Sequence, residues 1–305
     1  MATTQTLTRP ASLNEYLNRS KETLGPVWSE STQHGLTYQP QADDLFISPY
    51  DKCGTTWLQQ IVHSLRTRGD MDFENLMQVM PWLELAHWLG LDLYAPQPGD
   101  FQTFKSHLNY HQIPKGGRYI VSFRDPKDAL VSFYNFLNGH NWQKDAVSLS
   151  EFAKAIYLVY QGDRWERSYW GHLHSWWEQR HNPQVLLLCY ENMKADLPGT
   201  IRTISQFLNI ELDQALLALV VEQTSLEYML AHKAKFTETM VETAMAKIGF
   251  TPRSNRLVKV KTGRVGDHRT ELPAEIGAEM DAIWHKTIEA RTGLASYQAL
   301  RAALS

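Results

Sequence analysis

Four short apolar segments, each followed by a turn or a helical pattern, constrain the fold of this chain more than any other feature. They span residues 44–48, 103–106, 118–123 and 185–190. The last of them, VLLLCY, is apolar without alternation, which is typical of a strand buried on both faces of a parallel sheet. Helical patterns follow at residues 55–65, 127–137, 151–160, 163–180, 197–208 and 276–284. Strands that alternate with helices predict an α/β fold with a central parallel sheet flanked by helices.

The domain organisation follows from the absence of linkers and repeats. No Pro/Gly/Ser-rich stretch divides the 305 residues, so we expect a single domain over residues 1–305. Residues 236–255 carry few structural signals and are predicted to form a mobile lid.

Composition and charge exclude several classes of protein. The formal net charge of −3 argues against a nucleic-acid partner, because such proteins are usually strongly basic. The two cysteines, Cys53 and Cys189, are too few for a disulfide framework and favour a reducing, cytoplasmic setting. The sequence has neither a secretory signal nor an apolar run of about 18 residues, so no membrane span is expected.

The turn after the first predicted strand has the components of an anion-binding loop. It reads SPYDKCGTTW over residues 48–57, with Lys52 as a cation and Gly54 to admit a close approach of the backbone. The N–H groups at the start of the following helix add to this, since helix N-termini attract anions. The loop is not a Walker A motif, because Lys52 precedes the glycine. An ordinary strand–turn–helix remains the alternative, and a nucleophilic Cys53 is disfavoured because Gln59 stands where a cysteine phosphatase has arginine.

A second candidate anion site follows the third predicted strand. Residues 124–132 read RDPKDALVS, so Arg124 ends the strand and Ser132 lies about two helical turns further on. Arginine grips phosphate through two parallel hydrogen bonds, although a surface arginine paired with Asp125 or Asp128 would have the same sequence. Two separated sites at the same edge of a sheet suit a 3′,5′-bisphosphate better than an ordinary nucleotide.

A candidate general base follows the second predicted strand. Lys105 and His107 are two residues apart and share a face if the strand extends that far. Histidine suits proton removal near neutral pH. Because the chain has twelve histidines, an ordinary structural role for His107 is the alternative.

Taken together, these segments resemble the cytosolic sulfotransferases that use 3′-phosphoadenosine 5′-phosphosulfate (PAPS). The family's Tyr-Pro-Lys-Ser-Gly-Thr-Thr-Trp loop is matched with Asp51 in place of Pro and Cys53 in place of Ser. The resemblance implies sulfuryl transfer with adenosine 3′,5′-bisphosphate (PAP) as product. It implies that Arg124 and Ser132 bind the 3′-phosphate, that His107 is the catalytic base, and that Lys52 and Lys105 stabilise the leaving group. No metal is required for this chemistry.

The resemblance also implies further contacts with the donor. The remaining donor-binding residues expected from it are Cys53, Gly54, Thr55, Thr56, Trp57, Tyr190, Thr224, Ser225, Leu226, Lys261, Thr262 and Gly263. Trp57 is equally consistent with a core tryptophan.

The acceptor is expected to be a small molecule bound among aromatic side chains. The candidates are Trp82, Trp88, Tyr94, Phe136 and His140. The sequence leaves open whether oxygen or nitrogen is sulfated, and the oligomeric state stays open because residues 269–273 do not match the family's dimerisation segment. The competing hypotheses are a P-loop nucleotide kinase and a non-catalytic bisphosphate-binding module.

Overall fold

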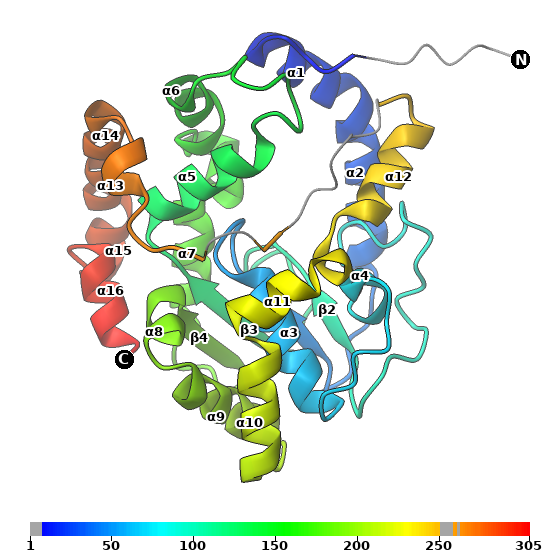
Figure 1. The fold of residues 1–305 in the computed structure, drawn as a ribbon. Coiled ribbons are helices and arrows are strands. Elements are labelled where there is room, and N and C mark those ends of the chain that lie inside the picture. Colours follow the sequence, from blue (N-terminus) through cyan, green and yellow to red (C-terminus); the bar gives the residue numbers. More distant parts are fainter. Residues whose placement is uncertain (1–7, 251–258, 261–262) are drawn as a thin grey trace, which may run out of the picture.

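The computed structural model describes residues 8–250, 259–260 and 263–305 of the chain. Its centre is a parallel four-stranded sheet in the order β2-β1-β3-β4 (Figure 1). The strands are β1 (Leu45–Ile47), β2 (Thr103–Lys105), β3 (Arg118–Phe123) and β4 (Val185–Cys189). Each predicted strand is confirmed, as is the α/β class.

Helices cover both faces of the sheet. They are α1 (Leu13–Arg19), α2 (Gly25–Leu36), α3 (Thr55–Arg66), α4 (Leu76–Val79), α5 (Pro126–Leu137), α6 (Leu149–Phe152), α7 (Tyr169–Trp177), α8 (Tyr190–Ala195), α9 (Leu197–Leu208), α10 (Gln214–Gln223), α11 (Leu226–Ala231), α12 (Thr239–Lys247), α13 (His268–Glu271), α14 (Ala274–Trp284), α15 (Ala290–Thr292) and α16 (Tyr297–Ala303). Within the described part of the chain, we find no helix with the length and apolar character needed to cross a membrane.

The two faces of the sheet bury different helices because side chains alternate along each strand. Ile120 packs with α3, α9 and α10 on one face. Its neighbours Tyr119 and Val121 pack on the opposite face with α5, α7 and α14. β3 is therefore buried on both faces, whereas the edge strand β4 buries Val185, Leu187 and Cys189 on one face and leaves Leu186 and Leu188 half-buried on the other.

The strand order places a crevice where the candidate site residues lie. From β1 the chain passes to β2 on one side and then returns to β3 on the other side of β1. Ligands of open parallel sheets bind at such a switch point, outside the carboxyl ends of the strands. The loop with Lys52 follows β1 and Arg124 follows β3, so both lie at this edge.

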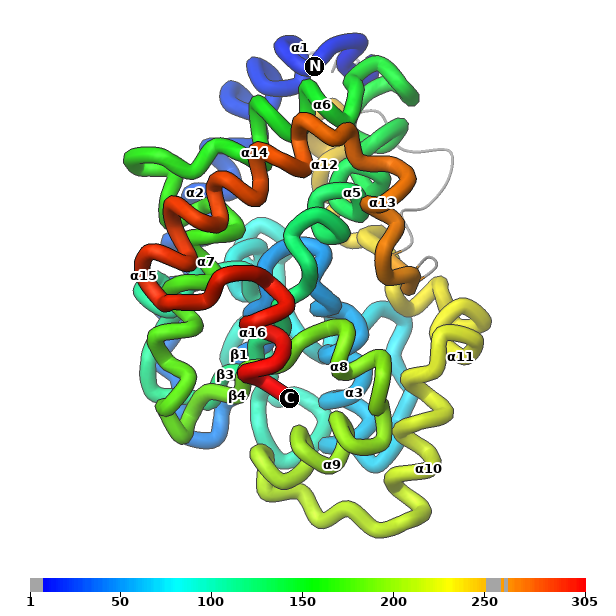
Figure 2. Tube along the Cα trace, turned by 90° about the vertical axis from the view of Figure 1, so that its left-hand side faces the viewer, coloured from blue at the N-terminus to red at the C-terminus, as the bar shows by residue number. Residues whose placement is uncertain are grey.

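The C-terminal helices close one side of the molecule. In Figures 1 and 2 the segment from α13 to α16, orange to red, runs down beside α5 and ends near α8. Arg301 Nε on α16 donates to Asn192 Oδ1 on α8 over 2.6 Å, and the Tyr297 hydroxyl donates to the Phe123 carbonyl at the end of β3 over 3.3 Å. These contacts tie the C-terminus to the edge of the sheet that carries the site.

Three predicted segments differ from the observed elements. Residues 151–160 are not one α-helix: α6 ends at Phe152 and a π-helical turn, Ala153–Tyr157, follows. Residues 163–180 are divided into a 3₁₀ helix, Gly162–Arg167, and α7, because Ser168 caps the second helix by accepting from Gly171 N over 3.0 Å.

The predicted lid also begins with regular structure. Phe236 is buried and α12 follows it, whereas residues 251–255 of the predicted lid lie outside the described residues.

Candidate active site

One cavity of about 430 Å³ lies at the carboxyl ends of the strands. It brings together residues from the loop after β1, the end of β2, α5, α8, α11, residues 259–260 and residues 263–264. The predicted site residues that line it are Lys52, Gly54, Thr55, Thr56, Trp57, Trp82, Lys105, His107, Arg124, Ser132, Phe136, Tyr190, Thr224, Ser225, Leu226 and Gly263. The two predicted anion sites and the predicted base therefore face the same space.

The loop between β1 and α3 has a backbone that suits an anion. Lys52 has φ of 63° and Gly54 has φ of 98°, both in the left-handed region. No side chain accepts a hydrogen bond from the first N–H groups of α3, because the residue before the helix is Gly54. Such a helix N-terminus is a site for a phosphate or sulfate group.

Gly54 is required by a close approach as well as by its backbone angle. A Cβ atom at Gly54 would lie 2.9 Å from Cδ2 of Tyr190. We expect Gly54→Ala to cost about 1–2 kcal/mol through the left-handed backbone alone, and more through the contact with Tyr190. Gly90→Ala is the matched control, because Gly90 has φ of 70° and nothing within 4 Å of the added atom. Thermal unfolding should show a larger fall in Tm for Gly54→Ala, and equal falls would show that Tyr190 yields without cost.

Side chains of β3 and its following residue hold this loop in place. Arg124 Nη1 donates to the Lys52 carbonyl and Nη2 to the Arg264 carbonyl, each over 3.0 Å. The Ser122 hydroxyl donates to the Cys53 carbonyl. Arg124 therefore joins the loop after β1 to the segment at 263–264, and its guanidinium lies at the junction of the two.

Two buried polar atoms at this junction accept or donate no hydrogen bond among the described residues. They are Thr55 Oγ1 and Arg124 Nε. A buried donor without a partner costs about 1–3 kcal/mol, so such atoms usually mark the place of a ligand or a water molecule. Both residues line the cavity, although these two atoms are themselves buried.

An aromatic corner closes one end of the cavity. Trp57 Nε1 donates to the Thr224 carbonyl over 2.9 Å, and the Trp57 and Tyr190 rings meet edge to face with centroids 5.6 Å apart. The Arg124 guanidinium lies 4.8 Å from the centre of the Tyr190 ring. Trp57 is thus half-exposed to the cavity and is not a core residue alone.

Two lysines at the other end rest on aromatic rings. Lys52 Nζ lies 3.8 Å from the centre of the Phe136 ring, and Lys105 Nζ lies 3.3 Å from that of Trp82. Burial lowers the pKa of Lys105 to about 8, with nearby Lys259 acting in the same direction. Lys105 is still mostly protonated at neutral pH, so its ammonium group remains a cation there.

His107 is held in one tautomer beside these lysines. Its Nδ1 lies 2.7 Å from the Pro49 carbonyl, which can only accept, so Nδ1 carries the hydrogen and Nε2 has the lone pair. Burial lowers the pKa of His107, while Asp51 and Glu84 act in the opposite direction. An imidazole with a lowered pKa is neutral at neutral pH and is able to accept a proton at Nε2.

Four predicted residues are not brought into the cavity. Cys53 is fully buried, and burial raises the pKa of its thiol, which speaks against a nucleophile. Trp88 packs beside α12 in a small apolar cluster, Tyr94 is exposed on the surface, and His140 contacts the Asn138 carbonyl. The predicted donor-binding residues Lys261 and Thr262 lie outside the described residues.

The cavity also has charged residues that the sequence did not single out. Glu238 and Lys259 line it and form an ion pair with an N–O distance of 3.1 Å. The carboxylate of Asp51 lies 3.6 Å from His107 Nε2. Lys259 directly precedes the predicted donor-binding residues 261–263 and Glu238 lies within the predicted lid, but nothing in the sequence assigned either a role in the site, whereas Asp51 stood out as a departure within the loop.

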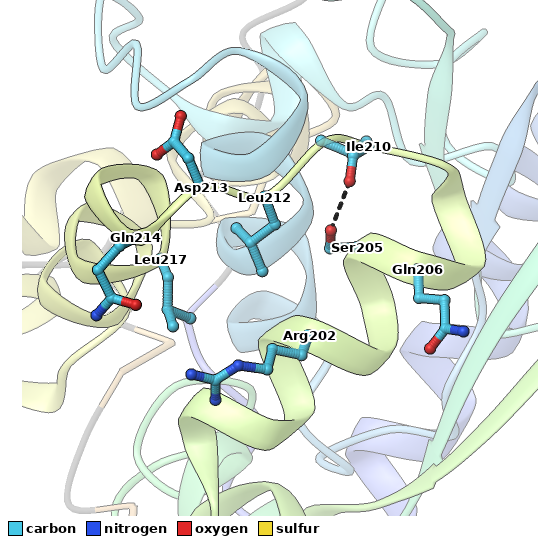
Figure 3. Close-up of a pocket in the computed structure, with 8 residues that line it drawn as sticks. All are labelled: Arg202, Ser205, Gln206, Ile210, Leu212, Asp213, Gln214 and Leu217. Atoms are coloured by element: carbon cyan, nitrogen blue, oxygen red, sulfur yellow. Dashed lines mark hydrogen bonds between the residues drawn. The ribbon is translucent and has the colours of Figure 1, made fainter.

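A second hollow of about 300 Å³ lies between α9 and the start of α10 (Figure 3). Figure 3 shows Arg202 and Gln206 on α9, with the Ser205 hydroxyl donating to the Ile210 carbonyl over 2.7 Å. None of the predicted site residues lines it.

One exposed group of potential metal ligands occurs among the described residues, although none was expected. Glu30, His34 and His87 have ligand atoms within 4.8 Å of one another. The two imidazole rings are stacked 3.7 Å apart at 11°, so their lone pairs run nearly parallel and do not converge on one point. The group does not line the cavity.

Comparison with known proteins identifies the class. A family model described as "Sulfotransferase domain" matches residues 42–292. Sulfotransferase 2A6 of Rattus norvegicus is 30% identical over 266 residues, which cover 84% of this chain and 86% of that protein. Luciferin sulfotransferase of Photinus pyralis is 26% identical over 309 residues, which cover 90% of this chain and 80% of that protein. The family model spans most of the chain, so the chain belongs to the sulfotransferase family of enzymes.

The fold is shared with solved structures of this family. A crystal structure of retinol dehydratase in complex with androsterone and inactive cofactor PAP has a TM-score of 0.66 to this chain at 20% identity. The match covers 90% of this chain and 94% of the other. The resemblance inferred from the motifs is thereby confirmed at the level of family and fold.

Proposed function

We propose that this protein transfers a sulfuryl group from PAPS to a hydroxyl or amine of a small-molecule acceptor. The observation that carries the proposal is that Lys52 and Arg124 line the same cavity. Arg124 bonds to the carbonyl of Lys52 itself, so one nucleotide with phosphates at its 3′ and 5′ positions can reach both. Crystals of relatives of the same fold with bound PAP support the same donor.

In this proposal the donor lies across the switch point of the sheet. The start of α3, with Lys52, Thr55 and Thr56, binds the 5′-phosphosulfate. Arg124 and Ser132 bind the 3′-phosphate through charge-assisted hydrogen bonds. The adenosine contacts the aromatic corner of Trp57 and Tyr190, together with residues 224–226.

The chemistry proposed is an in-line displacement at sulfur. His107 Nε2 removes the proton of the acceptor as the acceptor's oxygen or nitrogen forms its bond to sulfur. The bond from sulfur to the bridging oxygen breaks, and its electron pair leaves with the bisphosphate. Lys52 and Lys105 stabilise the charge that develops on that oxygen. Cations that are already in place before the reaction lower its activation barrier strongly.

Ligand-induced thermal stabilisation tests the donor. PAP at about 100 times its dissociation constant should stabilise the fold by about 2.7 kcal/mol, and ATP at the same concentration should stabilise it far less. Stronger stabilisation by ATP would contradict the proposal and favour a kinase. Selective binding of PAP without transfer from labelled PAPS to any of a broad acceptor panel would favour the non-catalytic bisphosphate-binding module.

We also propose a cytoplasmic location. Both cysteines are buried as free thiols, a state that reducing compartments preserve.

A further inference from the structure

A carboxylate lies against the nitrogen that the proposed reaction uses. Oδ1 of Asp51 is 3.6 Å from Nε2 of His107, and the side chain of Asp51 lines the cavity with 37% of its surface exposed. The opposite nitrogen of His107 is occupied by the Pro49 carbonyl. A group that reaches Nε2 from the cavity therefore meets the carboxylate of Asp51 as well.

A second carboxylate faces the same end of the cavity. Glu238 is 8% exposed, and its Oε1 pairs with Lys259 Nζ. Its Oε2 is buried and accepts no hydrogen bond from a described residue. Glu238 and Asp51 both act on the pKa of Lys105, which places the two acids around one lysine.

Glu238 pairs with Lys259 and both acids act on Lys105, so the negative charge that an acceptor meets beside Nε2 is the partly exposed carboxylate of Asp51. A neutral hydroxyl acceptor has a proton for His107 but offers no positive charge to the carboxylate of Asp51, which lies beside the same nitrogen. An ammonium group satisfies both requirements, because it is a cation and carries several N–H donors.

We infer that the acceptor is a small-molecule amine, sulfated on nitrogen, whose ammonium group binds between Asp51 and His107. The inference rests on the proposed function and specifies its acceptor class.

The proton balance of N-sulfation matches two adjacent bases. The ammonium R–NH₃⁺ gives one proton to His107 Nε2, and the freed lone pair forms the bond to sulfur. The bond from sulfur to the bridging oxygen breaks, with its electrons leaving on the bisphosphate. The nitrogen now carries the sulfuryl group and two hydrogens, and it gives one proton to the Asp51 carboxylate. The products are R–NH–SO₃⁻, the bisphosphate and two protons, whereas a hydroxyl acceptor releases only one.

Paired acceptors test this with the full chain and labelled PAPS. The probes are primary amines and the alcohols of the same carbon skeleton, such as 2-phenylethylamine with 2-phenylethanol and a series of smaller and larger pairs. We expect wild-type kcat/KM to favour the amine across the series. Asp51→Asn should lower kcat/KM for the amines by roughly tenfold to a hundredfold, as expected for the loss of a hydrogen bond to a charged group. Turnover of the alcohols should fall by a smaller factor, because Asp51 also raises the pKa of His107 and its loss weakens the base for both acceptor classes.

The controls separate this inference from the proposed function. Asp163→Asn removes an exposed acid on the 3₁₀ helix Gly162–Arg167, outside the cavity, and should change neither activity. PAP affinity is measured for every variant and reports folding and donor binding. A wild-type preference for the alcohols, or an equal loss on both acceptor classes in Asp51→Asn, would overturn the inference while PAP binding keeps the sulfotransferase proposal intact. Failure of the wild type to bind PAP would instead overturn both.

Discussion

Replacing His107 by alanine should reduce turnover by about 10²–10⁴-fold, the usual contribution of a positioned general base. The reason is geometric: Nδ1 is committed to the Pro49 carbonyl, so Nε2 is the nitrogen available to accept a proton. Burial lowers the pKa of His107, which keeps the imidazole neutral and ready at neutral pH. Single-turnover measurements with labelled PAPS and a saturating acceptor would report the effect on the chemical step.

The same variant must keep its affinity for PAP if the role is catalytic. His107→Asn is an informative companion, because its amide can still donate to the Pro49 carbonyl but cannot act as a base. His111→Ala is the control, since His111 is exposed and its ring lies near Glu178. Recovery of turnover in His107→Asn, or loss of PAP affinity in His107→Ala, would show that the ring mainly supports the loop after β1.

The sheet could be predicted from sequence because its strands are short, apolar and separated by strong turn signals. The segment at 118–123 is observed as β3 with the same bounds, and 185–190 differs from β4 by one residue. The strand ends also located Lys52, His107 and Arg124 correctly at one edge, since parallel strands all end there. Local pattern and global fold agree in this part of the chain, which is the condition for successful prediction.

The acceptor end could not be predicted in the same way. Aromatic residues are as common in cores as in pockets, so composition did not distinguish Trp82, which lines the cavity, from Trp88, which packs beside α12. Glu238 reaches the cavity through the tertiary fold, and its ion pair with Lys259 is not visible in the sequence. The sequence predicts one helix over residues 163–180 because the aromatic pattern continues across Ser168. The division into two helices depends on a single hydrogen bond, in which the Ser168 hydroxyl accepts from Gly171 N.

The two departures from the family loop have different structural consequences. Cys53 points into the core and is fully buried, so the hydroxyl lost there would not have faced the cavity. Asp51 lines the cavity beside His107. The loop can therefore keep its anion-binding backbone, while the substitution at Asp51 changes the charge presented to the acceptor.

Replacing Lys52 by methionine should lower kcat by about 10²–10³-fold, comparable to the removal of one preorganised group that stabilises developing charge. Methionine keeps most of the length of the unbranched side chain but removes the cation that rests on the Phe136 ring. The effect should appear mainly in kcat, because the bridging oxygen gains charge only as the bond to sulfur breaks, and PAP affinity should fall less.

Lys127→Met is the matched control for this prediction, because Lys127 belongs to the second motif but its Nζ pairs with Asp281 over 2.7 Å and does not line the cavity. It should leave kcat unchanged. A Lys52→Met enzyme that loses PAP affinity as strongly as kcat would mean that Lys52 binds the donor equally in the ground state and the transition state. An unchanged kcat would indicate that Lys105, whose ammonium group lies over Trp82 near His107, stabilises the leaving group instead. Because these outcomes differ in which kinetic constant moves, one pair of measurements assigns the cation that stabilises the leaving group.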